Sequence, residues 1–297
     1  MNERLKILVT GSAGQLGLSL QAIVDQYSEY DFVFATRTEL DLSDTANMER
    51  YLEHNQFNVI INCAAQTAVD KAESEPELAN QLNHIAVKQF AEYVKKYNAK
   101  LIHISTDYVF DGKIHRPYQE NDLVEPQGVY GETKLRGELA VQNELENNAV
   151  IIRTSWVFSE YGSNFVKTML KLGKERDSLN VIFDQVGTPT YAKDLAVAIM
   201  EIINSSKFKT TNFNTEVMHF SNEGVCSWYD FAKTIFELGK ISCALSPIET
   251  KDYPTPAKRP YYSVLNKAKI KQTYQLTIPY WKDSLQQCLI ALQELEK

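Results

Sequence analysis

Short apolar runs alternate with amphipathic segments through the first half of the chain. The apolar runs cover residues 5–11, 31–37, 58–65, 99–106 and 148–155, and buried parallel strands have this composition. The segments between them repeat apolar residues at helical spacing over 15–26, 44–55, 76–98 and from about residue 129. Ser43 or Asp44 is expected to cap the second of these helices. The alternation predicts an α/β fold with a doubly wound parallel (Rossmann) sheet.

The second half of the chain has a less regular pattern. Helical spacing is found at 162–175, 191–206, 227–240 and 281–296, a strand pattern at 217–222, and a polar loop at 248–263. No linker rich in Gly and Ser divides the halves. We therefore expect an NAD(P)-binding domain over 1–156 and a smaller C-terminal α/β lobe, mainly for substrate, over 157–297. The two are expected to interleave, with part of 184–222 returning to the sheet.

A glycine-rich turn follows the first apolar run. The stretch "VTGSAGQLG" places Gly11, Gly14 and Gly17 between the expected strand and helix. Gly11 permits the tight turn, Gly14 lets the backbone approach a pyrophosphate, and Gly17 allows close packing of helix on strand. The N–H groups of the helix start suit phosphate oxygens. The turn predicts a dinucleotide site, to which we also assign Gln15 and Leu16.

The end of the second strand bears on the choice of cofactor. Arg37 stands twenty residues after Gly17, where an NAD site usually has an acid for the ribose hydroxyls. A guanidinium suits a 2′-phosphate, so we predict NADPH. NADH remains the alternative, because Glu39 is close enough to compete for the ribose. Asp41 and Leu42 are expected beside the adenine.

A candidate acid–base group follows the fourth strand. Ser105 and Thr106 end that strand, and Tyr130 and Lys134 lie one helical turn apart at the start of the next helix. Tyr130 is predicted to donate a proton to a ketone that accepts hydride. Lys134 is predicted to lower the phenol pKa and to hold the nicotinamide ribose, and Thr106 to polarise the carbonyl. Taken alone, a Tyr and a Lys four residues apart are more often a surface pair.

Composition and charge exclude several classes of protein. The net charge of −7 argues against a nucleic-acid surface, and no basic block interrupts the chain. The sequence has neither a signal-peptide pattern nor a long apolar run, so we expect no membrane segment and a cytoplasmic location. The four cysteines are widely spaced and the five histidines show no zinc spacing. We therefore expect reduced thiols and no metal.

Several sequence blocks, taken in order, carry a family resemblance. They are "CAAQTAVDKAE" (63–73), "STDYVFDG" (105–112), "VYGETKLRGE" (129–138), "IIRTSWVF" (151–158), "NFV" (164–166), "DQVGTPT" (184–190) and "AKRP" (257–260). The chain resembles the extended short-chain dehydrogenase/reductase family over 5–295. It is most similar to the branch that reduces the 4-keto group of a dTDP-4-dehydro-6-deoxy-L-sugar to give dTDP-L-rhamnose. The resemblance implies an NADPH-dependent enzyme with a dTDP-sugar substrate, at the final step of dTDP-rhamnose biosynthesis.

The resemblance also implies roles for individual residues. Those expected to line the nicotinamide ribose and pyrophosphate are Ala64, Ala65, Thr67 and Ser105. Those expected to hold the hexose are Val69, Asp107, Tyr108 and Trp156. Those expected to face the nucleotide diphosphate are Asn164, Gln185 and Arg259. The cation of Arg259 suits two phosphates on its own account, whereas Trp156 is alternatively a core residue and Gln185 a turn residue.

Two departures and two alternatives accompany the resemblance. Some relatives hold magnesium at a dimer interface through glutamates, one of them early in the first helix, where this chain has Ser19. We predict no such metal and leave monomer or homodimer open. Gln66 stands where relatives often have Tyr, and this difference leaves the sugar preference open.

The alternative functions are a related NDP-4-keto-6-deoxysugar reductase or epimerase, and a non-catalytic subunit like the regulatory subunit of methionine adenosyltransferase.

Overall fold

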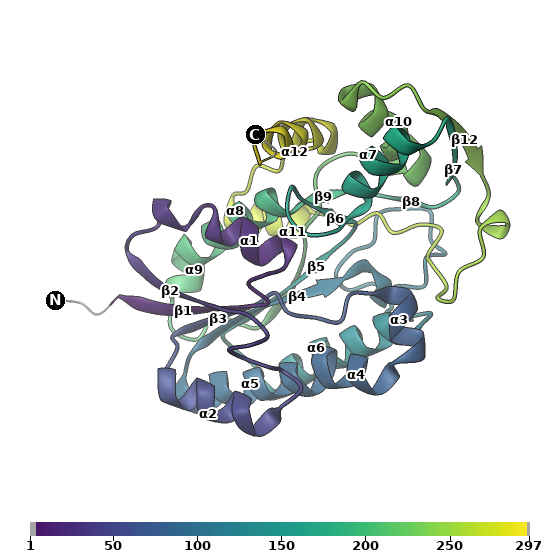
Figure 1. The fold of residues 1–297 in the computed structure, drawn as a ribbon. Coiled ribbons are helices and arrows are strands. Elements are labelled where there is room, and N and C mark those ends of the chain that lie inside the picture. The colour runs from purple at the N-terminus through teal and green to yellow at the C-terminus, as the bar shows by residue number, and fades with distance from the viewer. Residues whose placement is uncertain (1–3, 296–297) are drawn as a thin grey trace.

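One parallel sheet forms the centre of the computed structural model, which describes residues 4–295 (Figure 1). Within those residues the sheet has six strands in the order β10-β5-β4-β3-β1-β2, and each neighbouring pair is parallel. The strands are β1 (Leu5–Thr10), β2 (Tyr30–Ala35), β3 (Val59–Asn62), β4 (Lys100–Thr106), β5 (Ala149–Thr154) and β10 (Glu216–His219). The doubly wound α/β fold predicted from the sequence is confirmed.

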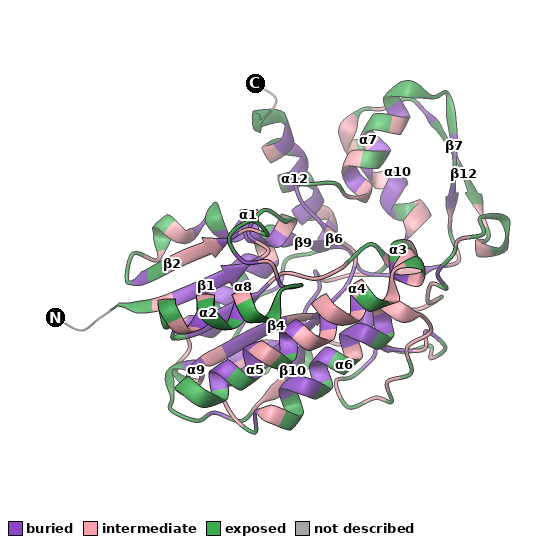
Figure 2. Ribbon diagram, turned by 60° about the horizontal axis from the view of Figure 1, so that its bottom comes forward, coloured by how far each residue is buried: buried purple, intermediate pink, exposed green. Residues whose placement is uncertain are grey.

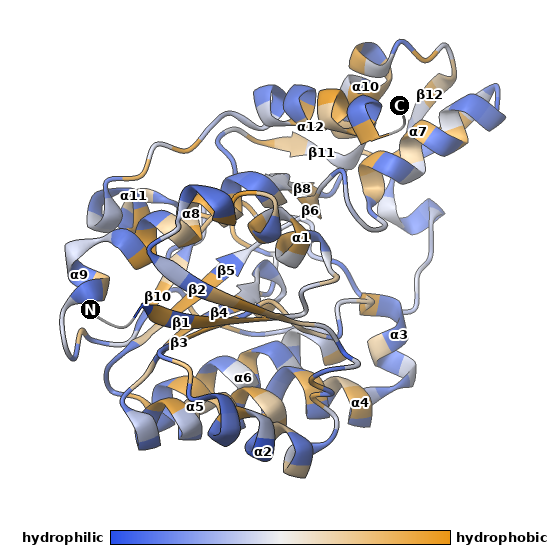
Figure 3. Cartoon of the chain, turned by 60° about the vertical axis from the view of Figure 1, so that its left-hand side comes forward, coloured by the Kyte–Doolittle hydropathy of each residue, from blue (hydrophilic) through white to orange (hydrophobic). Residues whose placement is uncertain are grey.

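Side chains of each strand alternate between two helical layers. Ile7 and Val9 of β1 enter one core, and Leu8 between them enters the other. The layer over Leu8 consists of α2 (Thr45–Asn55), α5 (Ala86–Tyr97) and α6 (Val129–Glu144). The opposite layer consists of α1 (Gln15–Gln21), α8 (Ala192–Asn204), α9 (Ser206–Lys209) and α11 (Ala268–Tyr274). Figure 3 shows the strands as an apolar layer between these helices. Asp44 caps α2 by accepting the N–H of Asn47, which decides between the two expected caps.

The segment expected to be one helix over 76–98 is broken into pieces. It begins with α4 (Pro76–Asn80), passes through a π-helical turn (Gln81–Ile85) and continues as α5, and a separate short helix, α3 (Val69–Ser74), precedes it. The π turn carries the buried Asn83, whose side chain binds both backbone groups of Gln66 at 2.8 and 3.2 Å. A side chain inserted into the loop before α3 therefore accompanies the widened turn, a feature that hydrophobic spacing does not encode.

A second lobe packs at one end of the sheet. Its core lies among α7 (Phe165–Glu175), α10 (Trp228–Gly239) and α12 (Trp281–Leu295). Short parallel or antiparallel pairs border it: β6 (Val157–Phe158) with β9 (Thr190–Tyr191), β7 (Ser178–Ile182) with β12 (Ala244–Ile248), and β8 (Val186–Gly187) with β11 (Cys226–Ser227). Single 3-10 turns complete the elements at Val24–Gln26, Asp107–Val109 and Thr250–Asp252.

The second half of the chain also contributes to the sheet layers. The strand β10 pairs with β5, and α8 packs beside α1 on the same face of the sheet. The helix α8 is buried at Leu195, Ile199 and Ile203, and Figure 2, which looks onto α5 and α6, shows buried residues along the strands behind those helices. Residues 192–204 and 216–219 thus share a core with the first half, while the division of roles between 1–156 and 157–297 stays a prediction. In the part of the chain that the structure describes, no helix is both long enough and apolar enough to span a bilayer.

Candidate active site

The turn between β1 and α1 is shaped by three glycines. Gly11 has φ +62°, and a Cβ there would lie 2.8 Å from backbone atoms of Ala64. A Cβ on Gly17 would lie 2.5 Å from the Cα of Ser12 and 2.6 Å from the carbonyl oxygen of Gly11. Gly14 is the N-cap residue before α1, and its N–H donates to the Gly11 carbonyl at 2.9 Å. Because side chains are excluded, backbone N–H groups of the helix start are open to a pyrophosphate, so the turn fits a dinucleotide.

A cleft of about 690 Å³ opens at the carboxyl ends of the strands and passes beside this turn. It collects most of the candidate residues: Gly11, Gly14, Gln15, Leu16, Arg37, Asp41, Leu42, Ala64, Ala65, Thr67, Val69, Ser105, Thr106, Asp107, Tyr108, Tyr130, Lys134, Trp156 and Asn164. Three candidates lie outside its lining: Gly17, Gln185 and Arg259. Ligands of open parallel sheets bind at this edge, so the cleft is the candidate active site.

Two charged side chains after β2 have different surroundings. The Glu39 carboxylate accepts the N–H of Thr36 at 2.6 Å and also its hydroxyl, which lowers the pKa of Glu39. Arg37 lines the cleft with a side chain 74% exposed, and its nearest anion is Asp41 at 3.5 Å. The Glu39 carboxylate, which would otherwise bind ribose hydroxyls, is thus engaged in hydrogen bonds with Thr36. The guanidinium is available for a 2′-phosphate, as NADPH requires.

The predicted acid–base residues meet in the cleft. Thr106 ends β4, and its hydroxyl donates to Asp107 at 3.0 Å. Tyr130 lies in the first turn of α6 and meets the ring of Tyr108 edge to face, with centroids 5.4 Å apart. Lys134, one turn further, is 2% exposed and donates from Nζ to the carbonyl oxygen of Ile104 at 2.6 Å. The helix α6 therefore delivers both groups against the end of β4.

Burial acts on both members of the predicted pair, and the tuning of the phenol by Lys134 stays a prediction. Burial raises the pKa of Tyr130 to about 12; a hydrogen bond with Thr106 opposes this rise, and the charge of Asp107 adds to it. Burial also lowers the pKa of Lys134 to about 8, against the charge of Glu138. The Lys134 ammonium donates to the Ile104 carbonyl, and desolvation is the largest effect on the pKa of the phenol. Tyr130 is consequently held protonated, the form that a proton donor needs.

Ser105 and Asp107, the chain neighbours of Thr106, both make hydrogen bonds in the protein interior. The hydroxyl of Ser105 donates to the carboxylate of Glu138 and is not free for a ligand, although Ser105 borders the cleft. Asp107 is buried, and desolvation raises its pKa to about 6 despite hydrogen bonds with Ser263 and Thr106. Within the described chain its Oδ2 atom has no hydrogen-bond partner. A ligand hydroxyl in the cleft would satisfy that oxygen.

An aromatic wall closes the cleft on the side of the second lobe. Trp156 adopts φ +47°, and its ring stacks on Trp228 at 3.6 Å with planes 11° apart. Trp228 begins α10 behind the capping box of Ser227 and Asp230, and it also lines the cleft. Trp228 is not among the site residues expected from the sequence. The Ser-x-x-Asp capping pattern marks the helix start that carries it, but only the fold brings 156 and 228 together.

The three residues assigned to the diphosphate end have separate positions. Asn164 caps α7, and its amide donates to the Gln15 side chain at 3.0 Å, so it borders the glycine turn. Gln185 is buried and donates to Thr250 at 3.2 Å. The Arg259 guanidinium grips Asp70 at 2.7 and 3.1 Å. Gln185 and Arg259 therefore bind the protein itself, outside the cleft lining, and their substrate roles stay predictions.

The environment of thiols and of possible metal ligands is plain. All four cysteines are free thiols, and burial raises the pKa of Cys63 in the cleft. Ser19, at the position where some relatives carry a glutamate, donates its hydroxyl to the Gln15 carbonyl. No group of three or more His, Cys, Asp or Glu side chains poised for a metal occurs among residues 4–295. The expectation of no metal stays a prediction.

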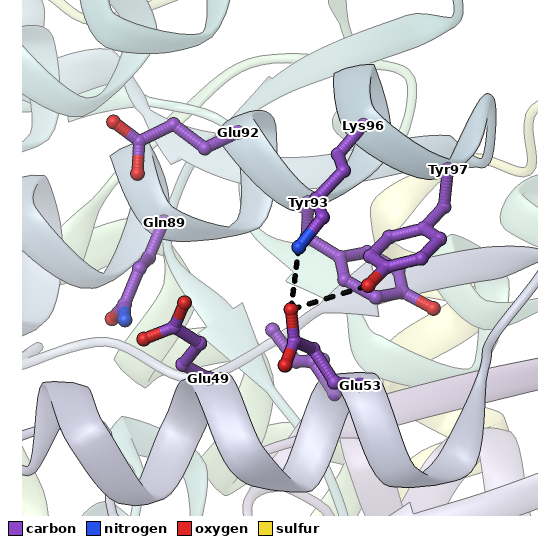
Figure 4. A pocket seen from close by; sticks show the side chains of 8 residues that line it. Glu49, Glu53, Gln89, Glu92, Tyr93, Lys96 and Tyr97 are labelled. Carbon is purple, nitrogen blue, oxygen red and sulfur yellow. Dashed lines mark hydrogen bonds and ion pairs between the residues drawn. The ribbon is translucent and has the colours of Figure 1, made fainter.

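A second hollow, of about 160 Å³, lies between α2 and α5 and is distinct from the cleft (Figure 4). Glu53 accepts a hydrogen bond from Lys96 at 2.6 Å and another from Tyr97 at 3.2 Å there. The other residues that line this hollow are Glu49, Leu52, Gln89, Glu92 and Tyr93. Leu52 and Tyr93 are buried and the other side chains are exposed or half-buried, and none of these residues lines the candidate site.

Comparison with known proteins agrees with this geometry. A chain from Aggregatibacter actinomycetemcomitans named dTDP-4-dehydrorhamnose reductase is 40% identical over 286 residues, covering 94% of this chain and 97% of its own. A crystal structure of a reductase of that name from Clostridium acetobutylicum has a TM-score of 0.91 at 39% identity, covering 97% of this chain and 100% of that one. A Bacillus anthracis reductase, solved in complex with NADP, has the same TM-score and coverage at 36% identity.

The family model described as RmlD substrate binding domain matches residues 5–294, almost the whole of the described chain. This match and the relatives confirm the resemblance drawn from the sequence blocks. The chain belongs to the RmlD substrate binding domain family.

Proposed function

We propose that this protein is an NADPH-dependent reductase that converts the 4-keto group of dTDP-4-dehydrorhamnose to the alcohol of dTDP-L-rhamnose, the final step of dTDP-rhamnose biosynthesis. One observation carries the proposal: the cleft places Thr106, Tyr130 and Lys134 beside a glycine turn that fits a dinucleotide. A non-catalytic subunit needs no such group of three. Relatives across the full length carry the same activity in their names.

The residues around the glycine turn would hold the cofactor. Backbone groups at Gly11 and Gly14 would meet the pyrophosphate, and Arg37 the 2′-phosphate. Ala64, Ala65 and Thr67 follow β3 and line the next part of the cleft. When bound, the reduced nicotinamide supplies the hydride.

Tyr130 would donate the proton that the reduction consumes. As hydride reaches C4, negative charge develops on the former carbonyl oxygen, whose affinity for a proton then rises. Burial holds the phenol pKa at about 12, so Tyr130 enters the step protonated. The hydroxyl of Thr106, which donates to Asp107 in this structure, can turn to the same oxygen.

Lys134 would fix the reacting groups. An ammonium has three N–H donors, and the Ile104 carbonyl takes one of them at 2.6 Å. The other two remain for the cofactor ribose and the phenol oxygen. Such an arrangement would bring a positive charge to the forming phenolate without requiring a free phenol of low pKa.

The substrate would lie between the acid–base residues and the second lobe. Val69, Asp107 and Tyr108 border the hexose position, and the stacked Trp156 offers an apolar face to the sugar. Arg259 would exchange Asp70 for the diphosphate, a stronger anion. Gln185 would act through its contact with Thr250, which also holds Asp184.

We place the enzyme in the cytoplasm, where its four free thiols stay reduced. It would act there on a dissolved nucleotide sugar as a monomer or homodimer. Light scattering of the purified protein distinguishes the two assemblies.

The decisive experiment follows NADPH oxidation by absorbance, with the 4-keto sugar made in situ by the epimerase that precedes this step. Turnover that requires the epimerase, and a product identical to dTDP-L-rhamnose by mass and retention, is the expected result. Without turnover, but with NADPH bound, a panel of other 4-keto-6-deoxy sugar nucleotides becomes the test. Capture of a stoichiometric synthetase partner, again without reduction, would replace the proposal by the regulatory alternative.

A further inference from the structure

A buried charged network lies directly behind the acid–base residues. Glu138 on α6 is one turn after Lys134, and its carboxylate is 1% exposed. Arg153 on β5 donates to it through Nε at 2.9 Å and through Nη2 at 2.7 Å. The hydroxyl of Ser105 on β4 donates to the same carboxylate. Ser105 and Arg153 are register partners of adjacent strands, so Glu138 ties α6 to both.

The arginine is fixed from its other side as well. Its Nη1 donates to the Glu120 carbonyl at 3.3 Å, and its guanidinium lies over the ring of Phe110 at 5.0 Å. The Arg153 side chain is 5% exposed. An anchored guanidinium holds the carboxylate of Glu138 at one place beside Lys134.

Stability alone is a weak reason for such a pair. Desolvating two charges costs several kcal/mol each, and buried ion pairs replaced by apolar residues often leave proteins equally stable. The position of the pair next to the site suggests another use. Lys134 is itself buried, and a buried ammonium is the disfavoured form unless an anion faces it.

Among the described residues, Glu138 is the anion near Lys134, because the groups that face Lys134 from the neighbouring elements are uncharged. The cleft end of β3 supplies Cys63, and β4 supplies His103; burial keeps the thiol protonated by raising its pKa and keeps the imidazole neutral by lowering its pKa. Around the carboxylate the charged side chains are Arg153 of β5 and, beyond it, Glu120, whose pKa burial raises. Tyr130, on the same helix, is protonated.

We propose that Glu138 is a positioning residue of the reductase site, which keeps Lys134 in its ammonium form and orients it by means of the buried network with Ser105 and Arg153. The inference rests on the proposed function, because it concerns the charge that Lys134 brings to the reaction. It assigns Glu138 no contact with substrate or cofactor. Nor does it require Glu138 to exchange a proton during turnover.

The test measures the pH at which kcat falls on the alkaline side. It compares the wild-type enzyme with double variants, called neutral pairs, that lack both charges of Glu138 and Arg153. Glu138→Gln combined with Arg153→Gln, and Glu138→Leu combined with Arg153→Leu, remove both buried charges together, so neither leaves an unpaired ion. We expect the alkaline midpoint to move about one pH unit to the acid side in both pairs, because Lys134 loses its anion. The single variant Glu138→Asp keeps a carboxylate beside Arg153, so its alkaline midpoint should lie between those of the wild-type enzyme and the double variants.

A matched control and a second readout separate this role from a structural one. Glu144→Gln removes a carboxylate from the partly exposed end of the same helix, where it pairs with Lys95, and should leave the midpoint in place. NMR titration of isotope-labelled lysine side chains in the cofactor-free protein should show the Lys134 resonance titrating at lower pH in the neutral pairs. The Lys134→Arg variant identifies the resonance by its loss.

The opposite outcomes are equally distinct. A neutral pair that folds with the wild-type midpoint and the wild-type lysine titration would overturn the proposal. Failure of both neutral pairs to fold, with Glu138→Asp folded and unshifted, would make the network structural and also overturn it. If the wild-type enzyme itself shows no turnover, the proposed function fails instead, and the lysine titration still decides the charge relation.

Discussion

Among single residues, Tyr130 shows how burial prepares a side chain for its task. A phenol in water has a pKa of about 10, and desolvation in the cleft raises it to about 12. The rise makes the phenol a weaker acid but guarantees that the proton is present. The proton is required only when the carbonyl oxygen has gained charge, and that oxygen then accepts it from a weak acid.

Replacing Tyr130 by Phe should reduce kcat by about a hundred- to ten-thousand-fold, the usual contribution of a positioned general acid. NADPH affinity should stay within a few-fold, because the ring and its packing on Tyr108 remain. Stopped-flow reduction and cofactor fluorescence measure the two quantities. Tyr274→Phe removes another buried hydroxyl, outside the cleft, and should not alter kcat. Unchanged turnover in the Tyr130 variant would disprove the proton-donor role.

The sequence predicts which residues lie in the cleft where backbone position decides, and fails where a distant partner decides. Gly11, Thr106 and Tyr130 were found because strand ends and helix starts place them. Arg259 and Gln185 were assigned to the substrate, yet in the structure they bind Asp70 and Thr250. Asp70 and Arg259 are 189 positions apart, and no local pattern reports such a pairing.

Among the elements, the β1–α1 turn has no room for a side chain at Gly11 or Gly17. Gly11→Ala should raise the Kd for NADPH more than tenfold and lower the free energy of unfolding by about 1–2 kcal/mol, since strain at positive φ is added to a 2.8 Å backbone contact. Isothermal titration and urea unfolding measure both. Gly162→Ala is the matched control: it has the same φ of +62° but meets only the side chain of Gln15, at 3.2 Å. Equal losses in the two variants would attribute the effect to strain alone.

The loop over 248–263 is tied to α3 by one carboxylate. Asp70 accepts two hydrogen bonds from Arg259 and one from the Ala257 N–H at 3.1 Å. In Asp70→Asn the loop should loosen by about 1 kcal/mol, a modest value because the pair is partly exposed. Trypsin cleavage after Lys251 and Lys258 in the ligand-free protein should therefore quicken several-fold. The control is Glu249→Gln, which removes an exposed ion pair with Lys251. If trypsin cleaves the Asp70 variant no faster than this control, Asp70 does not hold the loop.

Helix and strand order was predictable because buried parallel strands carry continuous apolar runs. The run at 58–65 gave β3, although β3 is confined to Val59–Asn62. The π turn at Gln81–Ile85 was missed, since its wider pitch accompanies the tertiary contacts of Asn83. The pairing of β7 with β12 was missed too, because β7 alternates over only five residues and β12 is largely exposed and contains Pro247.

Considering the whole molecule, two buried histidines couple folding to pH. His219 is fully buried on β10, and desolvation, helped by the charge of Arg153, lowers its pKa to about 3. The unfolded chain therefore binds a proton that the folded chain does not, between about pH 6.5 and pH 3. Stability contributed in this way is present at neutral pH and is lost as the pH falls through that window. His103, whose pKa is also lowered by burial, acts in the same direction.

Between about pH 7 and pH 5, the wild-type free energy of unfolding should fall by about 2 kcal/mol on account of His219 alone. His219→Gln keeps a donor for the Tyr118 carbonyl and should remove that part of the pH dependence, whatever its own stability at pH 7. Urea unfolding at the two pH values provides the measurement. His54→Gln, at an exposed position on α2, should preserve the wild-type slope. An unaltered slope in the His219 variant would show that another group controls acid unfolding.

The order in which this chain is synthesised has a consequence for how it folds. The strand β10 and the helix α8 belong to the sheet layers, yet they leave the ribosome long after the glycine turn and Tyr130. Until they emerge, the apolar side of β5 and the surface of α1 lack their covers and are exposed to chaperones and to aggregation. A nascent chain arrested before residue 192 should thus stay sensitive to protease, and one arrested after α11 has cleared the exit tunnel should become resistant. The catalytic side chains, although encoded early, would acquire their final positions only late in synthesis.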